Sequence, residues 1–406
     1  MQKIKDFIDN LCSDGVVYKK LGEIADIGTG SSNGNEAIED GKYPFFIRSQ
    51  TIKSKDEYEY DEEAIIIPGE GGVGDIFHYI NGKYALHQRV YRIHFRISEV
   101  DAKFAYYYMR AYFKPFIMKK AVNGTVSSIR KPMIEEFQIP LPPMAAQREI
   151  VHVLDKFTLL SSELAAELAA RKEQYDYYRS KLLTFDNEIE WKSILDVADT
   201  FTGLTYKPTD VSKDGTIVLR SSNIKESRLV FDDTVYVQME NIPERALVKP
   251  NDILICVRNG SQALIGKAAV IPETDKKMAF GAFMSILRAK EGLNYRYLFH
   301  VWQSSMIQGR IHNNSGMPIN QITKAEFEKI KIPVPPIHIQ ERIAHVLDNF
   351  DSVCADLKIG LPAEIEKRQQ QYEYYRDKLL TFNTESATIF DRQTDRQTDR
   401  QTDRQG

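Results

Sequence analysis

Residues 139–157 read IPLPPMAAQREIVHVLDKF, and residues 332–350 read IPVPPIHIQERIAHVLDNF. A second pair of blocks follows, YDYYRSKLLTF at 175–185 and YEYYRDKLLTF at 372–382. The offset between copies is 193 residues for the first pair and 197 for the second, so the second copy carries four extra residues between its blocks. Similarity of this length and spacing indicates an internal duplication.

Weaker similarity extends upstream of the blocks. YKKLGEIADIGTG at 18–30 matches WKSILDVADTFTG at 191–203, and FIRSQTIK at 46–53 matches LRSSNIK at 219–225. The repeated unit is therefore a globular head, a proline-rich joint and a helical arm. Since the arms are alike and the heads differ, we expect the arms to assemble while the heads read two different things. The pattern predicts six segments: an N-terminal helical lead at 1–16, a first head at 17–138, a first arm at 139–186, a second head at 187–331, a second arm at 332–383 and a disordered tail at 384–406.

The arms carry a helical pattern. Proline disfavours helix in the residue before it, so each arm helix should begin after its joint, near Met144 and near Ile337. Gly360 and Pro362 favour a break and a new first turn in the second arm. Apolar residues at alternating spacings of three and four predict a coiled-coil seam in each arm. The seam residues are Leu164, Leu168, Tyr175, Tyr178 and Leu182 in the first arm, and Leu361, Ile365, Tyr372, Tyr375 and Leu379 in the second.

One such stripe is typical of an ordinary core helix, but two matching stripes favour burial of one seam against the other in an antiparallel coiled coil. About 22 helical residues span roughly 33 Å, which is close to the roughly 34 Å of one turn of B-DNA. Two heads held at that separation could read two half-sites on one face of a duplex.

The heads are predicted to be β-rich modules of mixed class. The expected fold class is therefore α+β, with two such heads in a pseudo-twofold arrangement, separated by two long helices. Alternating and continuous apolar runs indicate strands, and longer aromatic runs indicate helices. The expected strands are 43–49, 64–68 and 84–95 in the first head, and 216–221, 252–258 and 284–289 in the second; the expected helices are 104–117 and 295–307.

Polar loops recur at matching places in the two heads. They follow an early strand, follow the apolar strand, and precede the joint. Arginine, asparagine, glutamine and serine bond base edges or phosphates, and glycine lets backbone amides approach a phosphate. Each loop, taken singly, is also compatible with a solvated turn. The candidate DNA-binding residues are Arg48, Ser49, Gln50, Lys53, Gly71, Gly72, Thr125, Ser127, Ser128 and Arg130 in the first head, and Arg220, Ser221, Asn223, Lys225, Arg258, Asn259, Ser261, Gln262, Asn314, Asn320 and Gln321 in the second.

Composition excludes several classes. The net charge of −3 and pI near 6.3 do not by themselves indicate a nucleic-acid binder. The first residues lack an apolar signal-peptide core, and no apolar run is long enough for a membrane span. The three cysteines, Cys12, Cys256 and Cys354, form no CxxC pair, so we expect neither a metal framework nor a disulfide scaffold, and a reduced cytoplasm fits.

Enzyme motifs are absent or weak. GEGGVG at 69–74 fits GxGxxG in form, but a strand-like run follows where a dinucleotide site needs a helix. The sequence contains neither a GxxxxGK[ST] loop nor an HExxH pair, nor the [DNS]PP[YFW] tetrapeptide of adenine methyltransferases. His152 and His345 match between the copies, but both fall on predicted helices, where a structural role is expected. We therefore expect no catalytic residues and no metal site.

The joint and arm blocks resemble the two conserved regions of type I restriction–modification specificity subunits. YKKLGEIADIGTG and the IRSQ block that follows resemble the opening of a target recognition domain in that family. The resemblance covers nearly all of residues 1–383, and it is most specific in the arms.

The resemblance implies a non-catalytic DNA-binding subunit of an adenine methyltransferase and endonuclease complex in a bacterial or archaeal cytoplasm. Each target recognition domain of the family reads one half of a bipartite DNA sequence, and the two conserved helices pack as an antiparallel coiled coil that fixes the spacer. Two methyltransferase subunits use S-adenosylmethionine, and restriction and translocase subunits use ATP and Mg²⁺. No cofactor is expected in this chain itself, and the partners can supply much of the phosphate contact.

The sequence also contains two short four-residue repeats, one in the first arm and one in the tail. SSELAAEL at 161–168 resembles the tandem four-residue repeats found in some arms of the family, in which each unit lengthens a helix by about 6 Å. The tail repeats Thr-Asp-Arg-Gln, which the codons ACA GAC AGA CAG encode as a perfect ACAG tract. We hypothesise that slippage in this tract switches the reading frame and gives phase variation; the alternative is a harmless low-complexity tail.

Two other functions stay open at this stage. The chain could be an enzyme, such as a nuclease, whose site these motifs miss, and methylation or cleavage of DNA by the purified chain alone would favour that. It could also be a coiled-coil scaffold without a DNA role, which sequence-specific protection of DNA by the complex would exclude.

Overall fold

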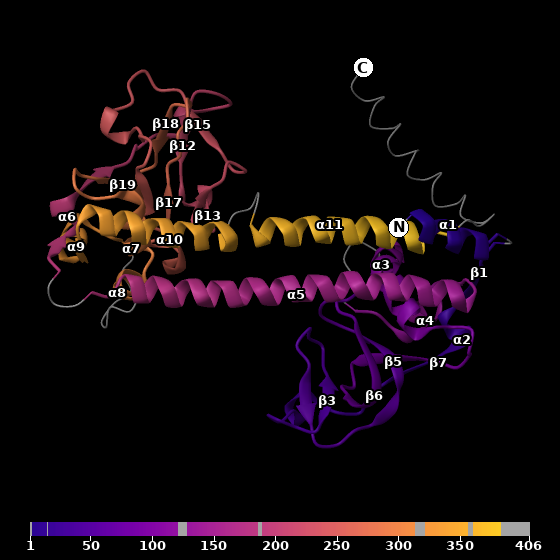
Figure 1. The fold of residues 1–406 in the computed structure, drawn as a ribbon. Helices are drawn as coiled ribbons and strands as arrows, with labels where there is room; N and C mark the ends of the chain where they lie inside the picture. Colours follow the sequence, from indigo (N-terminus) through magenta and orange to yellow (C-terminus); the bar gives the residue numbers. More distant parts are fainter. Residues whose placement is uncertain are drawn as a thin grey trace, which may run out of the picture. The chain divides into compact units, whose positions relative to one another are not determined.

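The computed structural model describes residues 2–13, 15–120, 128–185, 189–312, 321–355 and 360–382. These residues form two units (Figure 1). Unit 1 contains the described residues up to Ser162 and those from Lys367 onward, and unit 2 is built from residues between Glu163 and Glu366. Each unit therefore combines one head with parts of both arms.

Unit 1 is an α+β unit around a six-stranded sheet of order β2-β7-β5-β6-β3-β4. A separate two-stranded ladder joins β1 to β8, which places the start of the head beside the joint. Its elements are α1 (Gln2–Leu11), β1 (Val17–Lys20), α2 (Leu21–Ile24), β2 (Ala25–Thr29), β3 (Tyr43–Phe46), β4 (Lys53–Lys55), β5 (Tyr60–Pro68), β6 (His78–Leu86), β7 (Val90–Phe95), α3 (Ala102–Lys120), α4 (Lys131–Glu135), β8 (Gln138–Leu141), the first part of α5 (Met144–Leu182) and most of α11 (Leu361–Leu380).

Unit 2 repeats this plan with two four-stranded sheets, β10-β19-β16-β17 and β11-β15-β12-β18, and the ladder β20-β9 at its joint. Its elements are the rest of α5, β9 (Trp191–Ser193), α6 (Ile194–Val197), β10 (Ala198–Thr202), β11 (Val211–Ser212), β12 (Thr216–Leu219), β13 (Ile224–Lys225), β14 (Arg228–Leu229), β15 (Val235–Val237), β16 (Ile253–Cys256), β17 (Ala268–Val270), β18 (Met278–Phe280), β19 (Met284–Ala289), α7 (Tyr295–Trp302), α8 (Ser305–His312), α9 (Lys324–Lys329), β20 (Lys331–Pro333) and α10 (Ile337–Ala355).

The expected strands and helices are present, with two corrections. The run 84–95 is not one strand, because residues 87–89 form a turn between β6 and β7. The run 295–307 is not one helix, because α7 ends at Trp302 and α8 begins at Ser305. The two arm helices begin at Met144 and Ile337 and the second arm restarts at Leu361, all as predicted.

The central strand of each head is buried on both faces. In β5, Ile65 and Ile67 pack with helix α3, whereas Ile66 packs in a separate cluster on the other face. In β16, Ile253 and Leu254 divide between two clusters in the same way. Burial on both faces explains why these strands read as continuous apolar runs instead of alternating ones.

One difference separates the two sheets. The nine-residue β6 pairs with β5 along most of its length and with β3 at its end, so it joins both parts into one sheet. In unit 2 the corresponding strand is interrupted between β17 and β18 by a segment that contains Pro272. Proline has no N–H to donate to a ladder, which explains why β17 stays with β16 while β18 pairs with β12.

The arms pack in a reciprocal manner. In unit 1, Phe157 of the first arm lies against Tyr372 and Tyr375 of the second arm, with ring centroids 6.3 and 5.8 Å apart. In unit 2, Phe350 of the second arm lies 6.1 and 5.4 Å from Tyr175 and Tyr178 of the first arm. In each unit the start of one arm therefore packs on the end of the other, as Figure 1 shows for antiparallel α5 and α11.

This arrangement modifies the predicted seam. The tyrosines of each seam contact a phenylalanine from the opposite copy's first block, because antiparallel overlap aligns the start of one arm with the end of the other. All ten predicted seam residues are nevertheless buried or half-buried.

A buried glutamine joins each head to its arm. Gln147 accepts a hydrogen bond from the Asp101 backbone N–H (2.8 Å) and donates to the carbonyls of Glu99 and Pro142. Gln340 repeats the arrangement, accepting from the Asn294 N–H (2.8 Å) and donating to the carbonyls of Gly292 and Pro335. Both side chains are 0% exposed, so these amides have no water to replace their partners.

A second matched contact lies about two helical turns further along each arm. Asp155 accepts from Lys103 Nζ (2.7 Å) and from the Tyr107 hydroxyl (2.6 Å). Asp348 occupies the equivalent place and pairs with Arg296 and with His300 Nε2. Burial raises the pKa of Asp348, but the hydrogen bonds from His300 and Arg296 outweigh it and lower that pKa to about 2, so the carboxylate stays charged.

We predict that Gln340→Ala destabilises unit 2, because it leaves a buried N–H and two buried carbonyls without partners. An unsatisfied buried polar group costs about 1–3 kcal/mol. Urea unfolding of the purified chain should show the unit 2 transition shifted to lower urea. Gln174→Ala, at an exposed site on α5, is the control and should change little. Equal stability of the two variants would show that the buried amide does not hold the head.

Candidate functional site

Three segments of unit 1 converge on the turn between β6 and β7. Strands β3 and β6 are parallel, so their ends lie together and Arg48 follows β3 beside the turn. The loop after β5 joins the same place, because the Gly69 N–H donates to the Arg89 carbonyl (2.9 Å). The segment before α4 completes it, since the Ile129 N–H donates to the Gly69 carbonyl (2.8 Å).

Unit 2 assembles the equivalent place from equivalent parts. Parallel pairing of β12 with β18 brings Arg220 beside the turn between β18 and β19. The Val257 N–H donates to the Phe283 carbonyl (3.0 Å), and the Ile322 N–H donates to the Val257 carbonyl (2.8 Å). The three loop sets predicted from the sequence are therefore neighbours in each head.

A matched glycine lies behind each turn. A Cβ on Gly30 would stand 1.8 Å from the Leu86 carbonyl oxygen, and a Cβ on Gly203 would stand 2.1 Å from the Gly281 carbonyl oxygen. No side chain fits at either position. Gly30 and Gly203 are the last residues of the matching blocks 18–30 and 191–203. The need for glycine at this place explains why both blocks end in the same residue.

The first head has a hollow of about 260 Å³ lined by Gly34, Ile47, Arg48, Glu70, Gly71 and His87. Arg48 (2.9 Å) and Arg89 (3.0 Å) both pair with Glu70. Hydrogen bonds from Arg89 and then Arg48 lower the pKa of Glu70. Burial, with the charges of Arg48 and Arg89, lowers the pKa of His87. Two cations share one carboxylate here, which leaves a local excess of positive charge.

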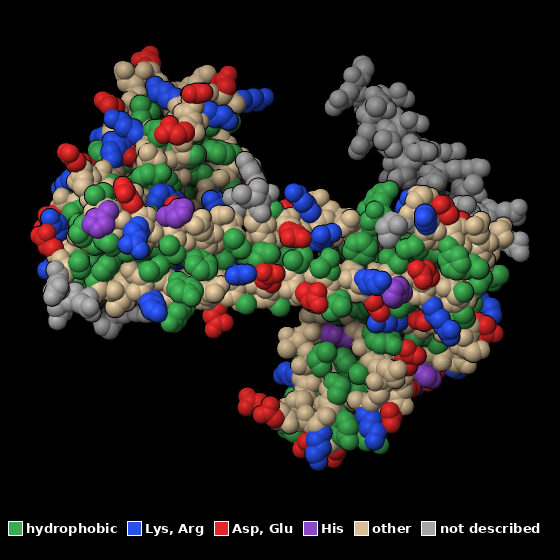
Figure 2. Space-filling view, viewed as in Figure 1, with side chains coloured by type: hydrophobic (Ala, Val, Ile, Leu, Met, Phe, Trp, Pro, Cys, Tyr) green, Lys and Arg blue, Asp and Glu red, His purple; other side chains and the backbone are tan. Residues whose placement is uncertain are grey.

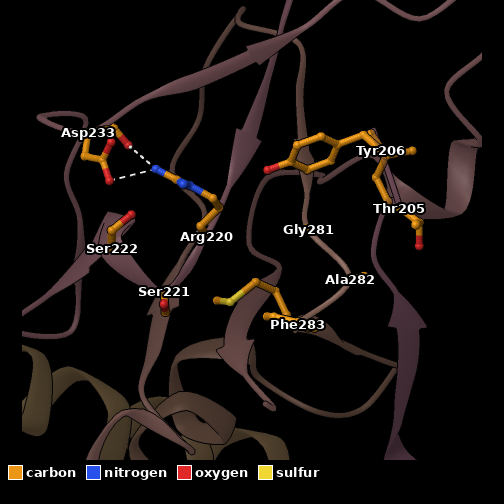
Figure 3. Close-up of a pocket in the computed structure, with 11 residues that line it drawn as sticks. Thr205, Tyr206, Arg220, Ser221, Ser222, Asp233, Gly281, Ala282 and Phe283 are labelled. Atoms are coloured by element: carbon orange, nitrogen blue, oxygen red, sulfur yellow. Dashed lines mark hydrogen bonds and ion pairs between the residues drawn. The ribbon is translucent and has the colours of Figure 1, made fainter. Parts of the chain in front are cut away.

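The second head has a larger hollow of about 550 Å³ at the equivalent place, between Leu204–Tyr206, Arg220–Ser222, Asp233 and Gly281–Met284. Arg220 is held by Asp233 at 2.7 Å, and Figure 3 shows the Tyr206 hydroxyl pointing towards Arg220 across the hollow. The buried Arg220 Nε has no hydrogen-bond partner among the described residues. The Arg258 guanidinium lies 5.2 Å from the centre of the ring of Phe283, which lines this hollow.

The other predicted residues of the first head that the structure describes fall into three groups. Gln50, Lys53, Ser128 and Arg130 are exposed. The Ser49 hydroxyl and carbonyl hold the local chain, bonding the Thr51 N–H and His78 Nε2. Gly71 and Gly72 have φ of +67° and +71°, a conformation that favours glycine. Thr125 and Ser127 lie outside the described residues.

In the second head, Asn223 departs from expectation. Its side chain is 0% exposed, and its amide bonds the Arg220 N–H and the carbonyls of Val230 and Asp233. Asn223 therefore holds the loop and offers no atom to a ligand. Of the remaining predicted positions, Ser261 and Gln321 are exposed and Gln262 is half-buried. Asn259 donates a hydrogen bond to Ser221, and Lys225 pairs with Asp232. Asn314 and Asn320 lie outside the described residues.

The sequence reasoning missed the turns themselves. Gln88 and Arg89 in the first head, and Ala282 and Phe283 in the second, are exposed between buried neighbours. In the first head the polar run His87–Arg89 breaks the predicted strand 84–95, whereas the second turn has no polar run to mark it.

Within the described parts of the chain, no group of three or more histidine, cysteine, aspartate or glutamate side chains could hold a metal ion. A search of the same residues finds no helix long and apolar enough to cross a membrane.

Comparison with known proteins defines the class. The family model described as "Type I restriction modification DNA specificity domain" matches residues 13–171 and again residues 187–367. The chain therefore belongs to the type I restriction–modification DNA specificity family, as the arm blocks had suggested, and it carries the domain twice.

Individual relatives agree with this assignment. The Escherichia coli EcoR124I/EcoR124II type I restriction enzyme specificity subunit is 33% identical over 69% of this chain and 70% of its own length. A Haemophilus influenzae protein named as type I restriction enzyme specificity subunit S.HindORF215P is 25% identical over 94% of this chain and 100% of its own. The solved S subunit of Mycoplasma genitalium has the same fold, with a TM-score of 0.61 at 15% identity, covering 91% of this chain and 97% of that one.

The chain is thus a non-catalytic specificity subunit with two target recognition domains, the two heads. In such systems the cofactors are used by the methyltransferase and restriction subunits.

We predict that Gly30→Ala displaces the turn at residues 87–89, since the new methyl group would overlap the Leu86 carbonyl oxygen. The substitution should destabilise unit 1 by about 2–4 kcal/mol. Thermal unfolding measures the loss. Gly28→Ala, two residues earlier, is the control because its Cβ would meet Arg92 only at an ordinary 3.5 Å. Similar melting temperatures for the two variants would contradict the close approach.

Proposed function

We propose that each head reads one half of a bipartite DNA sequence, and that the two half-sites differ. The observation that carries the proposal is the matched hollow in the two heads, which has an arginine at the same place and differently composed turns. The arginines are common to both heads, so they suit a feature common to both half-sites, the phosphate backbone. The differing residues suit two different base sequences, so the target should not be a palindrome.

The proposed DNA contacts are the predicted loop residues that the structure leaves accessible, together with the carboxylate-held arginines. Asn223 is left out because it is buried. The surface has no large excess of positive charge on the face drawn in Figure 2, where Lys and Arg are interspersed with Asp and Glu. The net charge of the chain is −3. Phosphate binding needs more cations than this surface offers, so we propose that partners supply part of the affinity.

The proposed partners are two methyltransferase subunits and the restriction and translocase subunits of a type I complex. The duplicated arms support this, because a surface present twice suits a partner present twice. A solved chain of the same fold, TM-score 0.58 at 14% identity, is described in work on "complex assembly" of the type I restriction–modification system. Because DNA is the proposed ligand, we place the complex in the bacterial cytoplasm.

Methylome sequencing of cells with and without this chain tests the function. The expected result is a split, asymmetric motif with methylated adenine in both parts, present only in cells that carry the chain. An unchanged methylome in cells that express the methyltransferase partners would contradict the proposal.

We further propose that the length of α5 sets the spacer between the half-sites. This helix is continuous over 39 residues, roughly 58 Å at 1.5 Å per residue. Residues 165–168 lie within it, and four residues are close to one helical turn, so their removal shortens the helix by about 6 Å while nearly keeping its faces.

Deletion of residues 165–168 should therefore change the spacer and preserve both half-sites, as read by methylome sequencing. Glu167→Ala alters the same exposed segment without changing its length and should leave the motif intact. Altered half-sites with an unchanged spacer would refute this role of α5.

The repeat tail, from residue 384, lies outside the described residues. Our proposal of phase variation by repeat slippage rests on its sequence alone. Mixed codons without a four-base repeat in the gene would rule it out.

A further inference from the structure

We infer that the two turns, residues 87–89 and residues 281–283, select the bases of the two half-sites. The inference rests on the proposed function and names the segment of each head that discriminates.

The first argument is geometric. The first turn links β6 and β7, the two antiparallel neighbours of β5. The second turn links β18, which pairs with β12, to β19, which pairs with β16. Each turn forms part of the wall of its head's hollow. Its first residue is buried and its next two are exposed in both heads. Arg89 and Phe283, the equivalent third residues, are each 56% exposed. A tight turn bearing two outward side chains is narrow enough to enter a DNA groove that admits a two-stranded ribbon.

The second argument is rigidity. The turn of the first head is bonded on both sides: the Gln88 N–H donates to the Ser32 carbonyl (3.0 Å), and the Arg89 carbonyl accepts from Gly69 (2.9 Å). In the second head the Phe283 carbonyl accepts from both Val257 and Arg258. A side chain discriminates between bases best when its backbone is fixed before binding.

The third argument compares the two copies. The backbone support, the glycine behind the turn and the arginine beside it are all repeated, whereas the exposed pair changes from Gln88 and Arg89 to Ala282 and Phe283. Residues shared by two heads with different targets cannot tell those targets apart. The exposed residues that differ between the heads therefore lie on a turn whose backbone is held in the same way in both.

The exposed residues of the first turn are polar, and those of the second turn are apolar. Gln88 carries an amide, now bonded to Asn33 at 2.7 Å, and Arg89 carries a guanidinium bonded through Nη1 to Glu70. Glutamine suits the adenine edge and arginine suits the guanine edge. Ala282 and Phe283 offer only apolar surface, which suits the thymine methyl group. We therefore assign purine recognition to the first turn and thymine contact to the second.

The test exchanges the turn residues. The double variant Gln88→Ala with Arg89→Phe gives the first head the exposed pair of the second. Expressed with its partners and read by methylome sequencing, it should change or relax one or two base positions of one half-site, leaving the other half-site and the spacer unchanged. Preference for the original base should fall roughly 5- to 150-fold, the discrimination carried by a lost base contact.

Arg96→Phe is the matched control. Arg96 is also exposed and follows the far end of β7, roughly 20 Å along the strand from the turn, and its replacement should leave the motif unchanged. A motif unaltered by the double variant would overturn the inference, as would a change in both half-sites.

Two further outcomes are distinguishable. If the unmodified chain directs no split motif, the proposed function itself fails. If the double variant abolishes all methylation, the single variants Gln88→Ala and Arg89→Ala decide: relaxation at one half-site supports the role of the turn, and an intact motif refutes it.

Discussion

The structure depends on an exchange between the two copies of the duplicated unit. Phe157 packs on tyrosines of the second arm, and Phe350 packs on tyrosines of the first. Neither unit is built from one copy alone, since each contains a head of one copy and arm segments of both. The duplication is therefore a structural requirement: a single head with its own arm would leave these aromatic faces exposed to water.

The head-to-arm contacts extend this constraint to the sites. Gln147 and Gln340 fix each head with the same three hydrogen bonds, made where no water can substitute. Asp155 and Asp348 add a charged contact to a lysine in one unit and an arginine in the other. These contacts hold each head firmly on its arm and so supply the fixed backbone that the proposed selection of bases by the turns requires.

Much of the fold followed from sequence because it rests on local rules. Proline placed the starts of the arm helices at Met144 and Ile337, and continuous apolar runs predicted strands at 64–68 and 252–258, where β5 and β16 lie. The heptad spacing identified buried seam residues but not their partners, because spacing gives one face of a helix and not what covers it. The Phe–Tyr contacts join residues roughly 170–220 positions apart and depend on the antiparallel overlap of the arms.

The site was predictable in part for a similar reason. Arg48 and Arg220 were recognisable because both copies keep them, and the structure places each in its hollow. Asn223 was misjudged because composition cannot distinguish an amide that caps a loop from one that faces solvent. The two turns are not apparent from a comparison of the copies, because their exposed residues differ between the two heads.

We propose that each head reads its half-site independently of the other while fixed to one of two antiparallel arms. The most direct measurement is the methylome directed by a chain whose second head, residues 191–331, is replaced by a second copy of the first, residues 18–138. The account predicts an inverted repeat of the first head's half-site, because the arms run in opposite directions. A motif that still contains the second half-site, or one in which the first half-site is lost, would contradict it.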